Sequence, residues 1–431
     1  MYSMKILCAL LGLLLLPTVM RAADPGEGAG PFRIISREIL SDRKPYMERA
    51  YYPEPTGDRI MGRGFVSDDN GKTWVKFHTT PDYQAKVPAG FRRGIPTGVV
   101  DPRNGLLFLP SNALDTPKLD PTIQEPPIAM SEYYLRYRVS KDGGRTWLFD
   151  EPVIHTGYSE MNPFKGMYRG KNAMLTSDTG NNPIITHTGR VVLPVMMTVL
   201  GDDGTLSNPA KTTSYTDVAI LLGTWKDEYR IAWREASQRL RLTPDVSTRG
   251  LIEPTLVQLN DQRLLMILRG SNARNPSLPS YKWMSVSSDD GDTWSQPQPW
   301  RYDDGRPFFS PSSMSFLLKH SSGRVFWVGN IHPENCNGND PRTTLVIGEV
   351  DVNSLLLQRA SVFAFDAKQP ADDARGQALL GTFDGKLDLS HVWVLEDRRT
   401  SELVITYQRA YGGYKKTDFT MVRMAVAPPS R

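Results

Sequence analysis

An eight-residue pattern that occurs three times constrains the fold of this chain more than any other feature of its sequence. The pattern is S-x-D-x-G-x-T-W, called the box below, and its copies begin at Ser67, Ser140 and Ser287. The residue types suit a tight turn, since Asp and Ser bond nearby backbone amides and Gly adopts a conformation that other residues avoid. A strand-like run precedes each copy, so we expect each box to form a corner between two strands.

The spacing of the boxes indicates a repeat. The first two copies lie 73 residues apart, and the second and third lie 147 apart, almost twice that spacing, so a unit with a decayed box should lie between them. The segment 217–225, an apolar strand with a short turn and Trp225, fits that unit, and 343–351 and 418–426 are equivalent strands further on. Six units of roughly 60 to 80 residues predict an all-β, six-bladed β-propeller with box turns. Five or seven blades remain alternatives, because residues 41–62 hardly provide two clear strands.

The boxes resemble the Asp-box, or bacterial neuraminidase repeat, of the sialidase superfamily of β-propellers. The resemblance covers essentially the mature chain as repeats and implies boxes at outer turns, far from the active site. It also implies an exo-glycoside hydrolase that cleaves terminal, acidic sugars from glycans and binds the sugar carboxylate with arginines.

The last unit ends after its third strand, and we expect Phe32–Leu40 to supply the outer strand of that blade and close the ring. Three long loops rich in Pro, Gly and Asp, 112–131, 148–172 and 366–386, are expected to form the rim around the pocket.

The N-terminal residues 1–23 have the pattern of a secretory signal: Lys5, an apolar run from Ile6 to Leu16, and small residues at Ala22 and Ala23. The apolar run is too short to span a bilayer. We therefore expect a cleaved signal, a single propeller domain over 24–431, a secreted or periplasmic location and no membrane insertion of the mature protein. Cys336 is then the one remaining thiol, which excludes an intramolecular disulfide.

Composition narrows the range of partners. A net charge of +4 is too small to indicate nucleic acid, whereas nine Trp and 10% aromatic residues suit short strands and stacking on sugars. The sequence has no H-E-x-x-H, no Gly-rich phosphate loop and no C-x-x-C, so neither a metal nor a cofactor is expected. The prediction is a monomer that binds a glycan or glycoside substrate.

The fourth unit carries the strongest site candidates. Glu253 begins its innermost strand and Arg269 ends the antiparallel partner, so both side chains should project to the same mouth of the hub. An acid and a guanidinium at one mouth either pair with each other or bind a polar ligand. The stretch resembles the segment where sialidases carry their catalytic glutamate and one of three substrate-binding arginines.

Three more arginines are candidates for the other two positions of that set. Arg342, after an Asn-rich loop, resembles the family's third arginine. The first precedes Ile-Pro in the family, and both Arg33, in Phe-Arg-Ile-Ile, and Arg93, before Gly-Ile-Pro, match in part. Arg33 also lies in the expected closing strand, so its two interpretations compete.

The sixth unit departs most from the family pattern. Sialidases place a tyrosine nucleophile at the start of this inner strand, where the present chain has Ser390-His391. Tyr407, Tyr411 and Tyr414 follow the second strand, near Arg409, and of these Tyr411 is the candidate nucleophile, with Arg409 a candidate for substrate binding. Without a tyrosine, His391 could act as general base or acid. The family's acid/base is an Asp of the first blade, for which Asp58 and Asp42 are available.

Two alternatives to a sialidase-like hydrolase stay open. One is a related propeller glycosidase or lyase that uses His391 and Glu253 on a non-sialic sugar. The other is a non-catalytic propeller that binds glycans.

Overall fold

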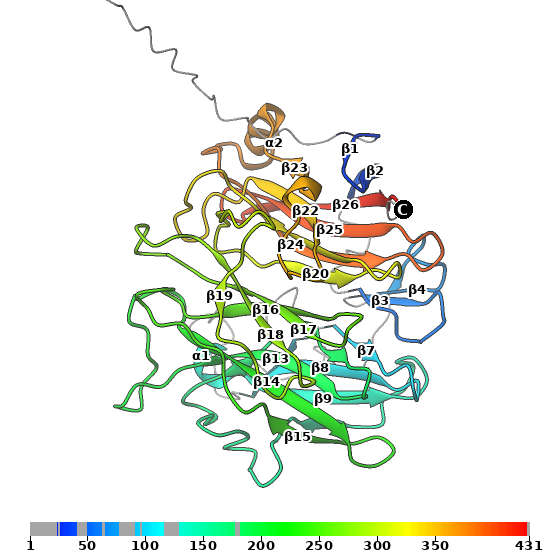
Figure 1. The fold of residues 1–431 in the computed structure, drawn as a ribbon, viewed down its shortest axis with the longest axis vertical. Coiled ribbons are helices and arrows are strands. Elements are labelled where there is room, and N and C mark those ends of the chain that lie inside the picture. Colours follow the sequence, from blue (N-terminus) through cyan, green and yellow to red (C-terminus); the bar gives the residue numbers. More distant parts are fainter. Residues whose placement is uncertain are drawn as a thin grey trace, which may run out of the picture.

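The computed structural model describes residue 24 and residues 26–40, 50–62, 65–76, 91–94, 97–115, 129–176 and 182–428. The described residues form six β-sheets, and these sheets are the six blades of a β-propeller (Figure 1). The prediction of an all-β, six-bladed propeller is therefore confirmed. The expected signal, residues 1–23, and Asp42 lie outside the described residues.

The first three blades come from the N-terminal half of the chain. Blade I contains β3 (Ile60–Gly62), β4 (Phe65–Ser67) and β5 (Val75–Lys76). Blade II contains β6 (Phe91–Gly94), β7 (Val99–Val100), β8 (Leu107–Asp115), β9 (Tyr134–Ser140) and β10 (Asp150–Pro152). Blade III contains β11 (Met174–Leu175), β12 (Ile184–Ile185), β13 (Val191–Thr198), β14 (Thr216–Trp225) and β15 (Ile231–Glu235).

The last three blades carry most of the candidate site. Blade IV contains β16 (Ile252–Gln258), β17 (Leu264–Arg269), β18 (Lys282–Ser287) and β19 (Gln298–Pro299). Blade V contains β20 (Phe316–Lys319), β21 (Val325–Asn330), β22 (Thr344–Val350) and β23 (Phe363–Ala367). Blade VI contains β24 (Leu387–Glu396), β25 (Leu403–Tyr411), β26 (Lys416–Val426), β2 (Phe32–Leu40) and β1 (Gly28–Ala29).

The two ends of the propeller share blade VI. Strand β2 pairs antiparallel with β26, from Phe32 opposite Val426 to Leu40 opposite Phe419, and Figure 1 shows the blue β2 beside the red β26. Phe32 and Ile34 are buried in the core between blades, while Arg33 between them is exposed, as the two-residue period of a strand requires. The predicted closing strand is confirmed.

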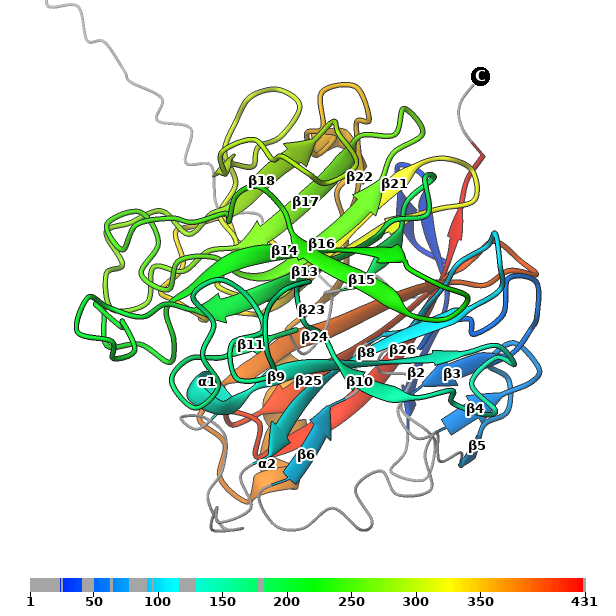
Figure 2. The ribbon, with the colours of Figure 1, turned by 90° about the horizontal axis from the view of Figure 1, so that it is seen from below.

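Apolar side chains fill each space between neighbouring blades. One cluster joins blades I and II, a second II and III, a third III and IV, and a fourth IV and V. The largest cluster joins blades V, VI and I, where Phe316, Trp393 and Ile60 pack together. In Figure 2 the blue strands of blade I lie beside the cyan strands of blade II and the red strand β26. The core is therefore a closed ring of interfaces around the hub.

The boxes form the expected corners. In the third box Ser287 Oγ donates to Asp289, and the carboxylate of Asp289 accepts from the backbone N of Thr293 at 2.9 Å and from its hydroxyl at 2.6 Å. Gly291 has a φ of 90°, and the indole of Trp294 donates to the Gly291 carbonyl oxygen at 2.9 Å. The same Ser, Asp and Thr bonds recur in the first two boxes.

The structure differs from the sequence prediction in two elements. Trp225 ends strand β14 instead of following its turn, and its indole donates to Asp101 of blade II. The expected rim loop 366–386 contains helix α2 (Pro370–Leu380). Pro370 suits the first helical turn, and the backbone N of Gln369 donates to the Asp372 carboxylate in a capping box, which stabilises the start of the helix. Two shorter helical turns are α1 (Ala129–Glu132) and the 3-10 turn η1 (Arg359–Ser361).

Candidate active site

Glu253 and Arg269 form a buried ion pair at one end of blade IV. Arg269 ends β17 opposite Ile252, and the register of β16 shifts between Ile252 and Thr255, which leaves Glu253 in a bulge with a φ of 46°. Arg269 Nη1 lies 2.5 Å from Glu253 Oε2, and the two side chains are only 6% and 11% exposed. The box follows the far end of the neighbouring strand β18, so the ion pair and the box lie at opposite ends of the sheet.

A second arginine from blade V joins this pair through Ser312. Arg269 Nε donates to the Ser312 hydroxyl at 3.0 Å, and Arg342 Nη2 donates to the Ser312 carbonyl oxygen at 2.6 Å. Arg269 Nη2 also donates to Asn339 Oδ1 at 3.0 Å. The structure therefore brings together Glu253, Arg269 and Arg342, three of the residues that the sequence singled out.

Arg249 is the third guanidinium of the cluster, and it is not among the site residues predicted from the sequence. Arg249 Nη2 donates to the Ser214 hydroxyl at 3.0 Å, while its buried Nε has no hydrogen-bond partner in the described part of the chain. Burial, and then the charge of Arg269, lower the pKa of Arg249. The available signal was its position four residues before Glu253, on the segment that enters the same strand.

The three guanidinium groups outnumber the carboxylate that faces them. Burial alone would raise the pKa of Glu253, but the positive charges of Arg269, Arg249 and Arg342 outweigh it and hold the pKa below its usual value. Burial and the charge of Arg342 lower the pKa of Arg269 despite its carboxylate partner. Arginine keeps its proton in proteins, so the lowered pKa values reflect positive charges that repel one another in a buried site. A bound anion would stabilise such a site.

Two hydroxyl groups and an imidazole of blade VI form a cluster next to Arg342, which comes from blade V. Arg342 Nη1 donates to the Tyr414 hydroxyl at 3.1 Å, and that hydroxyl lies 2.5 Å from Ser390 Oγ. Ser390 Oγ lies 2.8 Å from His391 Nδ1, and the Tyr414 hydroxyl lies 3.5 Å from the same nitrogen. A phenol, a hydroxyl and an imidazole within this reach can relay a proton.

Asp388 is a further carboxyl near this cluster. It is buried in β24 between the core residues Leu387 and Leu389, so strand alternation puts it on the same side as Ser390. Burial raises the pKa of Asp388 although the neighbouring Arg342 acts to lower it. The alternating sequence Leu-Asp-Leu-Ser was the signal that could have identified it.

The other predicted residues lie elsewhere. Arg33 is exposed on β2, opposite Ala425, and is not among the arginines that meet around Glu253. Asp58 pairs with Arg399, and its carbonyl oxygen accepts from Asn70 of the first box, so it lies at the box end of the molecule and not at the site. The side chain of Arg93, in β6, lies outside the described residues.

Tyr411 and Arg409 are held by structural partners. Arg409 makes ion pairs at 2.5 Å with Asp366 and with Asp372 of helix α2, and the Tyr411 hydroxyl donates to Asp372 at 3.2 Å. Both side chains are buried with those partners, so neither is placed for the role predicted for it. The tyrosine that reaches Arg342 and His391 is Tyr414, which lies in the turn after β25.

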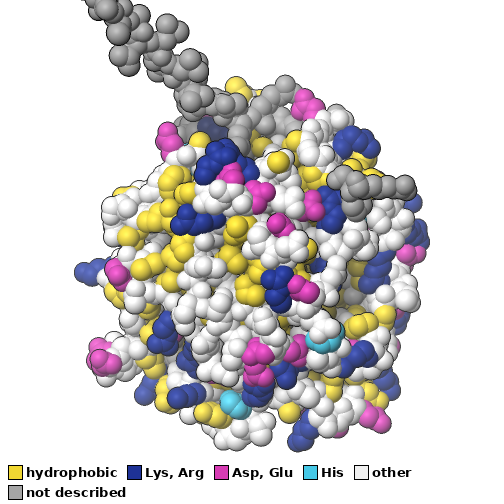
Figure 3. All heavy atoms as spheres, in the orientation of Figure 1, with side chains coloured by type: hydrophobic (Ala, Val, Ile, Leu, Met, Phe, Trp, Pro, Cys, Tyr) yellow, Lys and Arg dark blue, Asp and Glu magenta, His cyan; other side chains and the backbone are white. Residues whose placement is uncertain are grey.

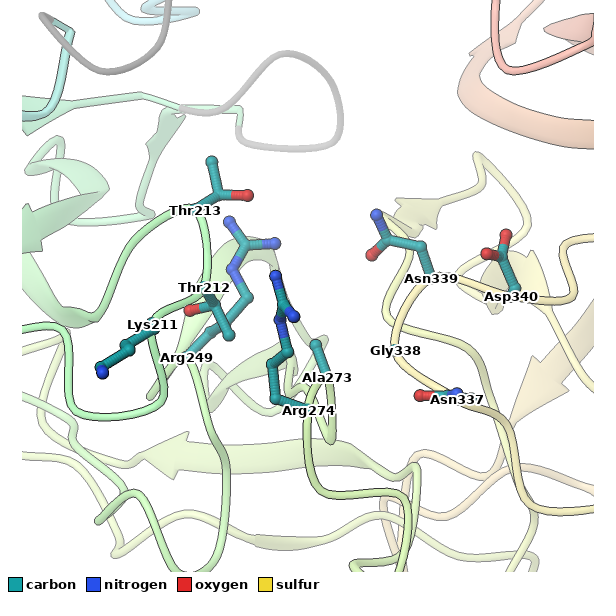
Figure 4. Close-up of a pocket in the computed structure, with 10 residues that line it drawn as sticks. All are labelled: Lys211, Thr212, Thr213, Arg249, Ala273, Arg274, Asn337, Gly338, Asn339 and Asp340. Atoms are coloured by element: carbon teal, nitrogen blue, oxygen red, sulfur yellow. The ribbon is translucent and has the colours of Figure 1, made fainter.

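A pocket of about 560 Å³ opens beside the arginine cluster (Figure 4). Two of its residues also belong to the cluster. The charge of Arg249 interacts with that of Arg269, and Asn339 accepts a hydrogen bond from Arg269. Figure 4 shows Arg249 and Arg274 extending into the pocket and Asn339 on its opposite wall. The complete lining is Lys211, Thr212, Thr213, Arg249, Ala273, Arg274, Asn337, Gly338, Asn339 and Asp340.

The charges and side-chain groupings of the other described residues indicate which kinds of partner the protein could bind. On the face in Figure 3 the Lys and Arg side chains are interspersed with Asp and Glu, so this face has no continuous basic area among the described residues. Within those residues no three His, Cys, Asp or Glu side chains are placed to hold a metal ion, and none of the helices is both long and apolar enough to cross a membrane.

These features define a class: a β-propeller whose hub carries three arginines around a carboxylate. The sequence profile of the BNR repeat-like domain matches residues 127–364. The chain therefore belongs to the BNR repeat-like family, as a divergent member of the sialidase superfamily, and the resemblance seen in the boxes is confirmed.

Solved structures share the fold at low sequence identity. A protein of unknown function from Dyadobacter fermentans is 13% identical, with a TM-score of 0.53 over 92% of this chain and 99% of that one. The NanB sialidase from Streptococcus pneumoniae is 11% identical, with a TM-score of 0.53 over 92% of this chain and 71% of that one. The leech intramolecular trans-sialidase is 13% identical, with a TM-score of 0.50 over 94% and 69%. A comparison with curated proteins found no match.

Proposed function

We propose that this protein is a glycoside hydrolase that releases a terminal acidic sugar from a glycan. The observation that carries the proposal is the excess of positive charge at the hub, where the buried Arg269 and Arg342 and the half-buried Arg249 face the carboxylate of Glu253. Guanidinium groups bind carboxylates through paired, charge-assisted hydrogen bonds, and a dry site strengthens those bonds. A sugar carboxylate is the ligand that this charge balance favours.

The contacts of Tyr414 make it the candidate nucleophile. In the proposed step its oxygen forms a bond to the anomeric carbon, its proton passes to His391, directly or through Ser390, and the bond to the leaving oxygen breaks. Asp388, whose raised pKa favours the protonated form, is the candidate donor of a proton to the leaving oxygen. Water then attacks the anomeric carbon and gives a proton to Asp388, the bond to the Tyr414 oxygen breaks, and His391 returns its proton to that oxygen, so the reaction is a hydrolysis.

This assignment departs from the family pattern in the partner of the tyrosine. The sialidase resemblance implies a glutamate that activates the tyrosine, whereas Glu253 is paired with Arg269 and the contacts of Tyr414 are to Arg342, Ser390 and His391. We assign Glu253 the task of holding Arg269 in position and tuning the charge of the site.

The test is release of a chromogenic aglycone from glycosides of sialic acid, glucuronic acid and neutral glucose. The expected result is turnover of at least one acidic glycoside and none of the neutral one. The variant Arg342→Lys should raise KM for the acidic glycoside by about tenfold or more, since one fork of hydrogen bonds is lost. Turnover of the neutral glycoside alone would contradict the proposal.

A second candidate is a propeller that binds acidic glycans without cleaving them. The ion pair between Glu253 and Arg269 favours it, because a carboxylate bound to a guanidinium is a weaker base. Calorimetric binding of an acidic sugar together with zero turnover of every glycoside would identify this function.

The location and assembly of the protein are also proposals. The pattern of residues 1–23 supports a cleaved signal, a mature domain over 24–431 and export to the periplasm or medium, and we propose that the exported protein is a monomer. Intact mass measurement and size-exclusion chromatography of the exported protein test these points.

A further inference from the structure

The pocket beside the arginine cluster contains more positive charge than one sugar carboxylate needs. Arg274 and Lys211 line it together with Arg249, and neither makes an ion pair or a side-chain hydrogen bond among the described residues. The one acidic residue of the lining, Asp340, is already paired with Lys386. The outer part of the pocket is thus a cationic surface without an internal counterion.

The segment that carries Arg274 is fixed to the segment that forms the opposite wall. Asn272, which is fully buried, donates to the carbonyl oxygen of Cys336 at 2.7 Å and accepts from the backbone N of Gly338 at 2.8 Å. A Cβ at Gly338 would lie 3.0 Å from the Cβ of Ala273, so the two walls meet closely at the floor. Arg274 and Asn339 therefore project from one rigid base.

The segment that carries Arg249 is tied to the same base. Ser247 Oγ accepts from the backbone N of Ser271 at 3.0 Å and donates to the carbonyl oxygen of Gly250 at 2.6 Å, which encloses Arg249 in a bonded turn. The buried Nε of Arg249 remains without a partner within the described chain. A cationic group held in place with an unused donor is preorganised for an anion, because binding then costs little ordering.

The backbone of the outer residues is also in an unusual conformation. Arg274 has a φ of 70° and Lys211 a φ of 50°, the left-handed region that residues other than Gly seldom adopt. Such conformations are strained for residues with a side chain, and they concentrate at functional sites.

We propose that Arg249, Arg274 and Lys211 form a second anion subsite, which binds a sulfate or phosphate ester on the sugar next to the terminal acidic sugar. This inference rests on the proposed function, because it places the terminal carboxylate at Arg269 and Arg342, with Arg249, which neighbours Arg269 and also lines the pocket, between the two anions. Two guanidinium groups around a tetrahedral oxyanion satisfy more of its oxygens than a single one can. The substrate class is then a glycan with two anionic groups on adjacent residues.

Calorimetry with three matched disaccharides tests the subsite. Each contains glucuronic acid linked to N-acetylgalactosamine, and the amino sugar is unmodified, sulfated or phosphorylated. The wild-type protein should bind at least one of the two esters about tenfold more tightly than the unmodified disaccharide, the gain of one charge-assisted contact. The ester with the larger gain identifies the natural group.

The variants Arg274→Ala and Arg301→Ala complete the design. Arg301 is an exposed arginine outside the pocket, whose guanidinium donates to the Gly305 carbonyl oxygen. Arg274→Ala should bind the ester no better than the unmodified disaccharide, while Arg301→Ala keeps the gain. Equal affinity of the wild type for all three disaccharides, no binding of any, or a gain that survives Arg274→Ala overturns the inference.

The turnover assay separates this result from the fate of the proposed function. An ester gain that depends on Arg274 in a protein without glycosidase activity supports the subsite and contradicts the hydrolase. Turnover of an acidic glycoside with no ester gain supports the hydrolase and removes the subsite.

Discussion

Glu253 and His391 occupy the same structural position in two different blades. Each lies in an innermost strand, Glu253 in β16 and His391 in β24. At each position a bulge gives that strand one residue more than the neighbouring strand it pairs with. Each has a left-handed backbone, with φ of 46° for Glu253 and 53° for His391. A bulge re-aims the side chain at the end of a sheet, so both blades use the same distortion to place a functional group at the hub.

Tyr414→Phe and Tyr411→Phe make a matched pair for the identity of the nucleophile. We expect Tyr414→Phe to lower kcat for an acidic glycoside by about 100-fold or more, because the reacting oxygen is removed. Tyr411→Phe should keep kcat and lower the free energy of unfolding by about 1 kcal/mol, since it loses only a hydrogen bond to Asp372. Steady-state kinetics and urea unfolding of both variants measure this, and the reverse pattern would return the role to Tyr411.

Glu253→Gln should separate binding from turnover. The substitution leaves three guanidinium groups with no carboxylate, so affinity for an acidic sugar should stay equal or increase while kcat falls by about 100-fold. The control is Glu349→Gln, which removes a carboxylate from an ion pair with Arg324 outside the pocket. Calorimetry and kinetics on both variants give the two quantities; weaker binding by Glu253→Gln would argue against an anionic ligand.

The ion pair of Glu253 predicts a pH dependence of folding stability. Its folded pKa lies below the ordinary 4.5, so in acid the unfolded chain takes up the proton first. The contribution of the pair is complete above about pH 4.5 and is lost as the pH falls through the folded pKa. Urea unfolding from pH 7 to pH 3 should show a steeper loss of stability below pH 4.5 in the wild type than in Glu253→Gln. Parallel curves would mean that the pair does not contribute.

The boxes should affect stability and not catalysis. Asp289→Asn weakens three bonds within the third box, so we expect the free energy of unfolding to fall by about 1 to 3 kcal/mol. Because the box lies at the far end of the sheet from Glu253, kcat and KM should not change. The control is Asp202→Asn in an exposed turn. A kinetic defect in folded Asp289→Asn would show that the two ends of the blade are coupled.

The fold could be predicted from the sequence because its signals are local. The hydrogen bonds that the Ser, Asp, Gly, Thr and Trp of a box make with one another join residues within eight positions, and each copy marks one blade. Strand pairing extends this reasoning to Glu253 and Arg269, since an antiparallel partner returns to the same end.

The missed residues depend on contacts that sequence patterns do not encode. Arg249 is positioned by bonds between Ser247 and Ser271, which lie 24 residues apart. The partner that holds Tyr411 away from this role, Asp372, lies in helix α2, where the sequence predicts only a loop. Tyr414 itself sits in a turn with a φ of 69°, and no strand or helix period predicts where such a side chain points.

The pairing of β2 with β26 sets the order in which the protein can mature. Blade VI, with His391 and Tyr414, combines strand β2, which is synthesised before blades I to V, with strands β24 to β26, which are synthesised after them. A growing polypeptide therefore carries β2 without its partner while blades I to V are synthesised, and blade VI is completed only when β26 follows. Until then its hydrogen-bonding edge is open to pairing with another chain, so aggregation during synthesis is the risk that this ring closure creates.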